Sequence, residues 1–129
     1  MGVSIGTANE EMASLLEPGA PSPGRRFATL RKLSEAGIDT YLMAAPIVRG
    51  VGDCDEALRK LVRLSSESGV KRIMWDKFNP KPIAGARLKA ALARRSIELV
   101  RVDDGWVESV RRTMQRECGD AGIELLDAF

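Results

Sequence analysis

The fold is decided by the stretch from Val3 to Leu33, which reads VSIGTANEEMASLLEPGAPSPGRRFATLRKL. Its short apolar start ends at Gly6, and a short helical segment then leads into the turn-forming sequence EPGAPSP. Ser22 is a typical N-cap residue, and Pro23 suits the first position of a helix because its fixed φ is already helical. The stretch therefore predicts a strand, a polar loop and a helix, which is the repeating unit of an α/β fold.

The same unit recurs along the rest of the chain. The predicted strands are short apolar runs, at residues 2–6, 38–45, 70–75 and 122–129. The predicted helices have apolar residues at helical spacing and lie at residues 9–17, 23–36, 54–68, 83–94 and 104–121. We expect Pro46 to close the second strand, Asp53 to cap the next helix, and Asp103 or Asp104 to cap the last one. Residues 96–102 keep no single period and suit either a short strand or an extended connector.

Helices that alternate with buried strands imply parallel strands joined by right-handed crossovers. Such strands form either an open doubly wound sheet or a (β/α) barrel. In both, ligands bind at the loops that follow the carboxyl ends of the strands. Here those loops are residues 6–22, 46–53 and 76–82, and they contain nearly all of the candidate chemistry.

Composition limits the classes of function. The 129 residues are 44% hydrophobic and 29% charged, which predicts one globular domain over residues 1–129, with a terminal helix and strand at 103–129. Histidine is absent, so Ser-His-Asp triads, Cys-His pairs and His-bound metals are excluded. The net charge of +2 gives no strong argument for a nucleic-acid partner.

The two cysteines, Cys54 and Cys118, stand far apart and outside any CxxC motif, so we expect free thiols and no metal bound by these residues. Trp75 and Trp106 are expected in the core rather than as stacking platforms. The N-terminal sequence lacks the features of a signal peptide, and no apolar run is long enough to span a membrane. We therefore expect a cytoplasmic protein with no membrane partner.

Several segments, in this order, resemble the later barrel strands of radical S-adenosylmethionine enzymes, and more narrowly the group related to spore photoproduct lyase. The most specific piece is EPGAPSP followed by Arg26-Phe27. The other pieces are Ser4-Ile5-Gly6-Thr7, Ala36-Gly37-Ile38, Ala45-Pro46-Ile47 and Asp76-Lys77-Phe78-Asn79-Pro80-Lys81-Pro82. The resemblance covers roughly the first two thirds of the chain.

The resemblance implies a partial (β/α) barrel, a half-barrel of repeated βα units, that corresponds to the C-terminal half of such an enzyme. S-adenosylmethionine would lie across the strand ends beside a [4Fe–4S] cluster. The cluster needs three closely spaced cysteines, and this chain has no CxxxCxxC motif, so an N-terminal segment would have to supply it. DNA lesion repair is the activity that the nearest resemblance suggests, with DNA as the partner.

The resemblance also implies roles for individual residues. The cofactor-binding residues would be Ser4, Glu17, Arg26, Pro46 and Ile47, and the substrate-binding residues would be Asp76, Lys77 and Asn79. Each has a purely structural alternative. Arg26 can pair with Glu17 instead of a cofactor carboxylate, Pro46 can simply end a strand, and Asp76 can pair with Lys77 in a turn.

Three interpretations remain open. The chain can be the cofactor- and substrate-binding part of a radical S-adenosylmethionine enzyme, a nucleotide-binding α/β domain without iron, or a half-barrel that completes itself with a second copy. A basic face on the later helices would favour DNA. However, acidic neighbours such as Glu98, Asp104 and Glu108 make a solvated helix surface the better interpretation.

Overall fold

Four parallel strands form one sheet in the order in which they occur in the chain. The computed structural model describes residues 1–77 and 82–129, and at 82–84 only the backbone. The strands are β1 (Gly2–Ser4), β2 (Tyr41–Ile47), β3 (Arg72–Lys77) and β4 (Glu124–Asp127), and each pairs in parallel with its neighbour. Because every crossover moves in the same direction along the sheet, the connecting helices lie on one face, as in a (β/α) barrel. The α/β half-barrel predicted from the sequence is confirmed.

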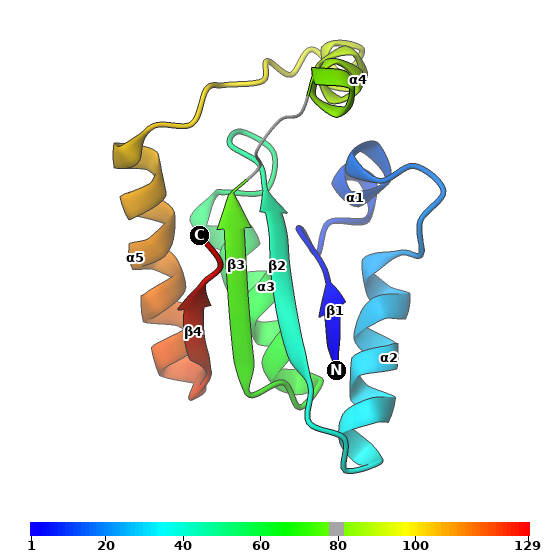
Figure 1. Cartoon of the computed structure of the whole chain (residues 1–129), viewed down its shortest axis with the longest axis vertical. Helices are drawn as coiled ribbons and strands as arrows, with labels where there is room; N and C mark the ends of the chain where they lie inside the picture. Colours follow the sequence, from blue (N-terminus) through cyan, green and yellow to red (C-terminus); the bar gives the residue numbers. More distant parts are fainter. Residues whose placement is uncertain (78–81) are drawn as a thin grey trace.

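The helices occupy three positions around this sheet. They are α1 (Glu10–Leu16), α2 (Pro23–Glu35), α3 (Asp55–Glu67), α4 (Pro82–Ala93) and α5 (Asp104–Ala121). Figure 1 looks onto the face without helices: α3 lies behind the sheet, while α2 and α5 flank its two edges. The remaining helices, α1 and α4, lie beyond the carboxyl ends of the strands and contact each other.

The main core lies between the sheet and α2, α3 and α5. Along β2 and β3 every second side chain is fully buried, namely Leu42, Ala44, Ile73 and Trp75. A second, smaller cluster joins Val48 to Leu88 and Leu92 of α4. The fold thus has a large core behind the sheet and a small one at its carboxyl end.

Helix ends agree with the sequence prediction at most positions. Ser22 caps α2 and Asp103 caps α5, in each case by accepting a hydrogen bond from a backbone N–H of the first turn. Asp53 does not cap α3. Its carboxylate instead accepts hydrogen bonds from the backbone of Gly50 and the indole of Trp106, and the Sγ of Cys54 takes the capping position.

Strand boundaries also differ from the prediction: β1 ends at Ser4, β2 begins at Tyr41, β3 begins at Arg72, and β4 covers only Glu124–Asp127. Two strands extend past their predicted ends. Pro46 does not end β2, which continues to Ile47 across a register irregularity that begins after Ala44. The third strand extends to Lys77, so the first two residues of the expected loop belong to β3. Residues 97–103 form a connector without a strand.

Both cysteines are free thiols; Cys118 is buried in α5 and Cys54 is exposed. Both tryptophans are buried, as expected. Among the described residues, no helix has the length and apolar character needed to cross a membrane.

Candidate functional site

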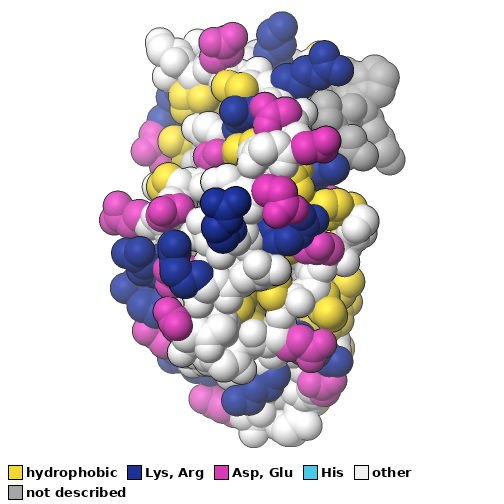
Figure 2. Space-filling view, turned by 90° about the vertical axis from the view of Figure 1, so that its left-hand side faces the viewer, with side chains coloured by type: hydrophobic (Ala, Val, Ile, Leu, Met, Phe, Trp, Pro, Cys, Tyr) yellow, Lys and Arg dark blue, Asp and Glu magenta, His cyan; other side chains and the backbone are white. Residues whose placement is uncertain are grey.

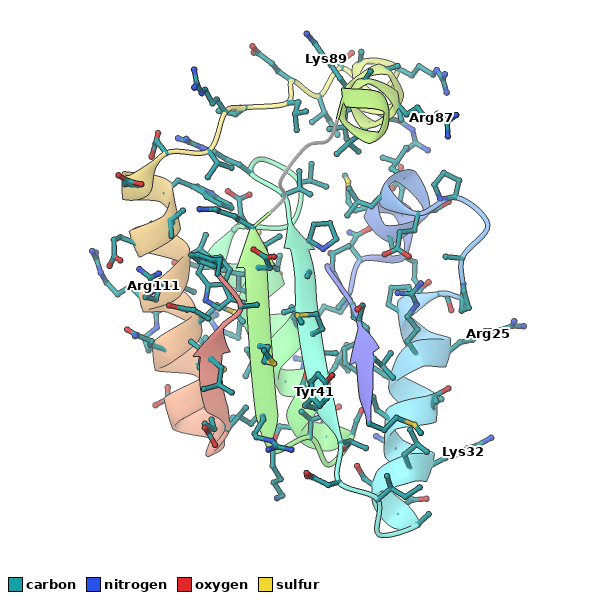
Figure 3. The ribbon with its side chains drawn as sticks, viewed as in Figure 1. Arg25, Lys32, Tyr41, Arg87, Lys89 and Arg111 are labelled. Atoms are coloured by element: carbon teal, nitrogen blue, oxygen red, sulfur yellow. The ribbon has the colours of Figure 1, made fainter. Side chains whose placement is uncertain are left out.

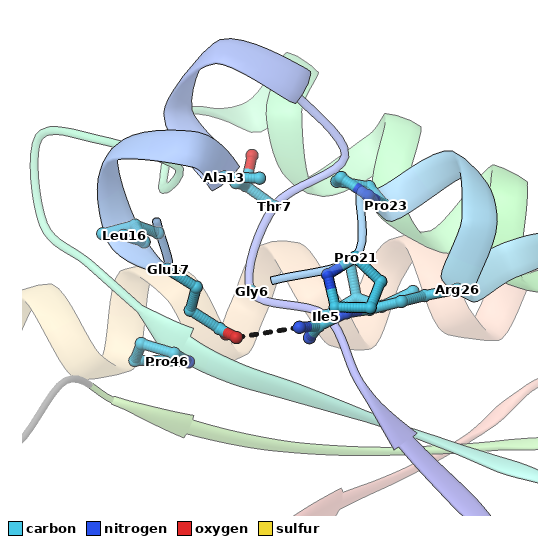
Figure 4. Close-up of a pocket in the computed structure, with 10 residues that line it drawn as sticks. All are labelled: Ile5, Gly6, Thr7, Ala13, Leu16, Glu17, Pro21, Pro23, Arg26 and Pro46. Carbon is cyan, nitrogen blue, oxygen red and sulfur yellow. Dashed lines mark hydrogen bonds and ion pairs between the residues drawn. The ribbon is translucent and has the colours of Figure 1, made fainter. Parts of the chain in front are cut away.

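A small hollow lies at the carboxyl end of β1, beneath α1. Its unfilled volume is about 300 Å³ with the open solvent at its mouth included, and about 20 Å³ of this admits the centre of a water-sized sphere. Its walls come from the end of β1, from α1, from the turn before α2, and from β2; they are Ile5, Gly6, Thr7, Ala13, Leu16, Glu17, Pro21, Pro23, Arg26 and Pro46. Figure 4 shows these side chains converging from segments that are far apart in the sequence. The hollow is therefore built by the fold and not by one loop.

Arg26 is the central polar side chain of the hollow. Its Nη2 lies 2.8 Å from Oε2 of Glu17, and its Nη1 donates to the backbone oxygen of Ser4. The Arg26 side chain is 19% exposed and the Glu17 side chain 43%, so the pair stands at the mouth of the hollow. The structural alternative predicted for Arg26, a pair with Glu17, is thus present, and it lies in the same place as the candidate cofactor residues.

Local sequence explains why these groups meet. Gly6 follows β1 and lies so close to β2 that a Cβ there would come within 2.5 Å of the Pro46 backbone oxygen. The turn after Glu17, the C-cap of α1, reverses the chain, and Ser22 with Pro23 then starts α2. Arg26, in the first turn of α2, consequently points back toward the end of β1.

The structure brings together four of the five predicted cofactor-binding residues. Glu17, Arg26 and Pro46 line the hollow, and the Ser4 backbone touches Arg26. Ile47 does not join them, because its side chain is fully buried in the main core.

The predicted substrate-binding residues are dispersed. Asp76 and Lys77 are consecutive in β3, and consecutive strand residues point to opposite faces of a sheet. The Lys77 ammonium lies 4.7 Å from the ring centroid of Phe129, beside the buried Trp75. Asp76 is therefore the one of the two on the open face, and the expected turn pair between them does not form. Asn79 lies outside the described residues.

Several lining residues were missed in the sequence. Ile5 and Leu16 provide apolar walls, and Thr7 is buried with its Oγ1 accepting a hydrogen bond from the Asn9 backbone. A usable signal existed for Ile5 and Thr7, because both flank Gly6, the glycine that follows β1. Leu16 gave no such signal, since a helical leucine is usually a core residue.

Chemically, the hollow offers a cation and an anion side by side next to apolar walls. A guanidinium binds carboxylates, and a carboxylate binds ammonium groups. Arg26 uses two N–H groups on protein acceptors, and a guanidinium carries five. The pair is therefore suited to a ligand that carries both charges, such as an α-amino acid.

Metal binding is not supported in this part of the chain. Among the described residues, no three His, Cys, Asp or Glu side chains gather closely enough to hold a metal ion. The sequence has two cysteines, fewer than the three thiolates that a [4Fe–4S] cluster of this kind requires. The chain by itself does not fit that cluster.

No protein-family model matches the chain. The chain is similar to an uncharacterized protein, ORF301, of Acidianus two-tailed virus, with 27% identity over 130 residues. That match covers 98% of this chain and 39% of the viral protein, so the chain spans about two fifths of that protein's length.

Proposed function

We propose that this chain is the S-adenosylmethionine-binding half of a (β/α) barrel, and that the hollow between β1, α1 and α2 takes the amino-acid end of that cofactor. The observation that carries the proposal is the Arg26–Glu17 pair at the carboxyl ends of β1 and β2. Ligands of parallel α/β folds bind at this end of the sheet.

The amino-acid end of S-adenosylmethionine has a carboxylate and an ammonium group on one carbon. Arg26 would bind the carboxylate and Glu17 the ammonium, since these are their preferred partners. Ile5, Leu16 and Pro46 would contact the apolar part of the ligand. The resemblance of EPGAPSP and Arg26-Phe27 to radical S-adenosylmethionine enzymes supports the same assignment.

The proposal stops at binding. The radical chemistry of such enzymes depends on an iron–sulfur cluster, which this chain does not fit, so no step of that chemistry is assigned to its residues. No DNA-binding role is assigned either. A surface that binds the phosphates of DNA is predominantly basic. On the α5 side of the molecule, Figure 2 shows acidic side chains among the basic ones.

Isothermal titration calorimetry of the purified chain tests the proposal. The ligands are S-adenosylmethionine, free methionine, and 5′-methylthioadenosine, which lacks the amino-acid end. We expect S-adenosylmethionine to bind more tightly than methylthioadenosine. Arg26→Ala should lower the affinity for S-adenosylmethionine by roughly 10- to 100-fold, because a charge-assisted hydrogen bond is lost. Glu17→Gln should weaken it as well.

Arg63→Ala is the matched control, since this exposed arginine lies on α3 and outside the hollow. The affinity of this variant for S-adenosylmethionine should equal that of the unmodified chain. Absence of S-adenosylmethionine binding would refute the proposal. If methylthioadenosine bound equally well and Arg26→Ala had no effect, the chain would instead be a nucleotide-binding domain without amino-acid recognition.

A further inference from the structure

The face of the sheet opposite the helices is uncovered among the described residues, and a mostly apolar row crosses it between the charged positions Arg72 and Glu124 on one side and Asp76 on the other. Ser4, Met43, Met74 and Leu126 lie in register across the four strands, and none is buried. Leu126 is 39% exposed. Figure 3 shows Tyr41, from the same face of β2, on the side of the sheet opposite α3. In a (β/α) barrel this face points to the interior.

Parallel sheets occur almost only with both faces covered. This sheet has its helices on one face, four strands, and two edges, β1 and β4, that pair on one side only. A closed (β/α) barrel has eight parallel strands. Two such sheets, facing each other and related by a twofold axis parallel to the strands, supply that number and remove all four edges.

The charges at the two edges are complementary. At the β1 edge, α2 has four basic side chains and one acidic one, a net charge of +3, and β1 has none. At the β4 edge, α5 and β4 together have three basic and six acidic side chains, a net charge of −3. The central helix α3 has three of each and is neutral. Twofold closure brings each positive edge beside a negative edge of the other copy, so a second copy fits both seams at once.

We propose that two copies of this chain close into an eight-stranded (β/α) barrel. Each copy places its β1 edge against the β4 edge of the other, and the row of Ser4, Met43, Met74 and Leu126 becomes part of the barrel interior. Arg25 and Lys32 project outward from α2, away from the sheet, where the neighbouring copy would lie (Figure 3). The inference rests on the open face and on the edge charges, and it does not depend on cofactor binding.

Sedimentation equilibrium and light scattering of the purified chain, without ligand, test this assembly. We expect twice the mass of one chain at micromolar concentration. The double variant Arg25→Glu, Lys32→Glu reverses the charge of one edge, and Glu108→Lys, Glu124→Lys reverses that of the other. Each should weaken dimerisation roughly tenfold or more at low salt, because like charges then meet at both seams.

Mixing the two double variants gives the decisive result. In the mixed dimer the reversed α2 edge meets the reversed β4 edge, and the two unmodified edges meet each other, so we expect dimers to return. An interface that joined like edges would already set like charges against each other in the unmodified chain, so neither double variant alone would weaken it. The variant Lys60→Glu, Arg63→Glu changes the same charge on α3 and should leave the dimer intact.

Met74→Asp tests the open face. It should give a monomer whose circular dichroism spectrum is unchanged, because Met74 does not point into the main core. A monomeric unmodified chain would overturn the proposal and assign the open face to a different protein segment. A dimer insensitive to both Met74→Asp and the edge variants would overturn it equally.

Discussion

At the scale of single residues, the indole of Trp75 depends on one partner. Trp75 is fully buried and its Nε1 donates to Oδ1 of Asp127 at 2.6 Å, while Arg111 binds the other oxygen. Asp127→Ala leaves the buried N–H unpaired. We expect it to lower the free energy of unfolding by about 1–3 kcal/mol, measured by urea denaturation. Asp127→Asn keeps an acceptor and should cost less; equal losses would show that Arg111, and not Trp75, is the important partner.

The thiol of Cys118 makes stability depend on pH. Burial raises its pKa from 9.0 to about 11. The folded state therefore retains the proton more tightly than the unfolded state, and this contribution is fully present below pH 9 and is lost as the pH rises toward 11. We expect the urea midpoint of the unmodified chain to fall across this range more steeply than that of Cys118→Ala. Parallel curves for the two proteins would contradict the prediction.

At the scale of elements, two glycines near the C-terminal end of α5 have opposite roles. Gly122 is the C-cap, and its φ of +69° disfavours any residue with a Cβ. Gly119 lies within the helix. At both positions an added Cβ would meet no atom within 4 Å. Gly122→Ala should therefore destabilise the protein by about 1 kcal/mol, and Gly119→Ala should stabilise it by about 0.5–1 kcal/mol. Thermal unfolding of the two variants measures both effects. The same sign for both would refute the assignment of the cap.

Local interactions explain which elements the sequence predicted. Ser22, Asp103 and the helix-ending glycines act within a few residues, so their roles can be read from neighbouring sequence. The prediction that Asp53 caps α3 was wrong because its carboxylate accepts a hydrogen bond from the indole of Trp106, which is 53 residues away. Local sequence does not reveal such a contact.

The candidate site shows the same division. Glu17 and Arg26 were predictable because one short turn joins them, and they form an ion pair. Simple alternation along β2 would place Ile47 on the open face with Met43, but the register irregularity after Ala44 turns it into the core. Such an irregularity depends on strand pairing, and strand pairing is not visible in a single segment.

At the scale of the whole molecule, the two hydrophobic clusters should differ in stability. Among the residues whose side chains the structure describes, the main core contains 19 buried ones from the sheet and the helices behind it, whereas the cluster between α4 and the loop after β2 contains three. Buried apolar area sets the free energy needed to open a region. The carboxyl-end cap formed by α1 and α4 should thus open without unfolding the sheet, and this cap covers the proposed ligand hollow.

Hydrogen exchange followed by mass spectrometry tests this separation. Amides of α1 and α4 should exchange faster than those of β2, β3 and α5. Leu92 is fully buried in the small cluster, so Leu92→Ala should lower the opening free energy of the cap by about 2 kcal/mol or more, a roughly thirtyfold faster exchange there, and leave β2 and β3 unchanged. Leu61→Ala, in the main core, should instead accelerate exchange throughout the chain. Faster exchange in β2 and β3 on Leu92→Ala would mean that cap and sheet unfold as one unit, and ligand entry would then require opening of the main core.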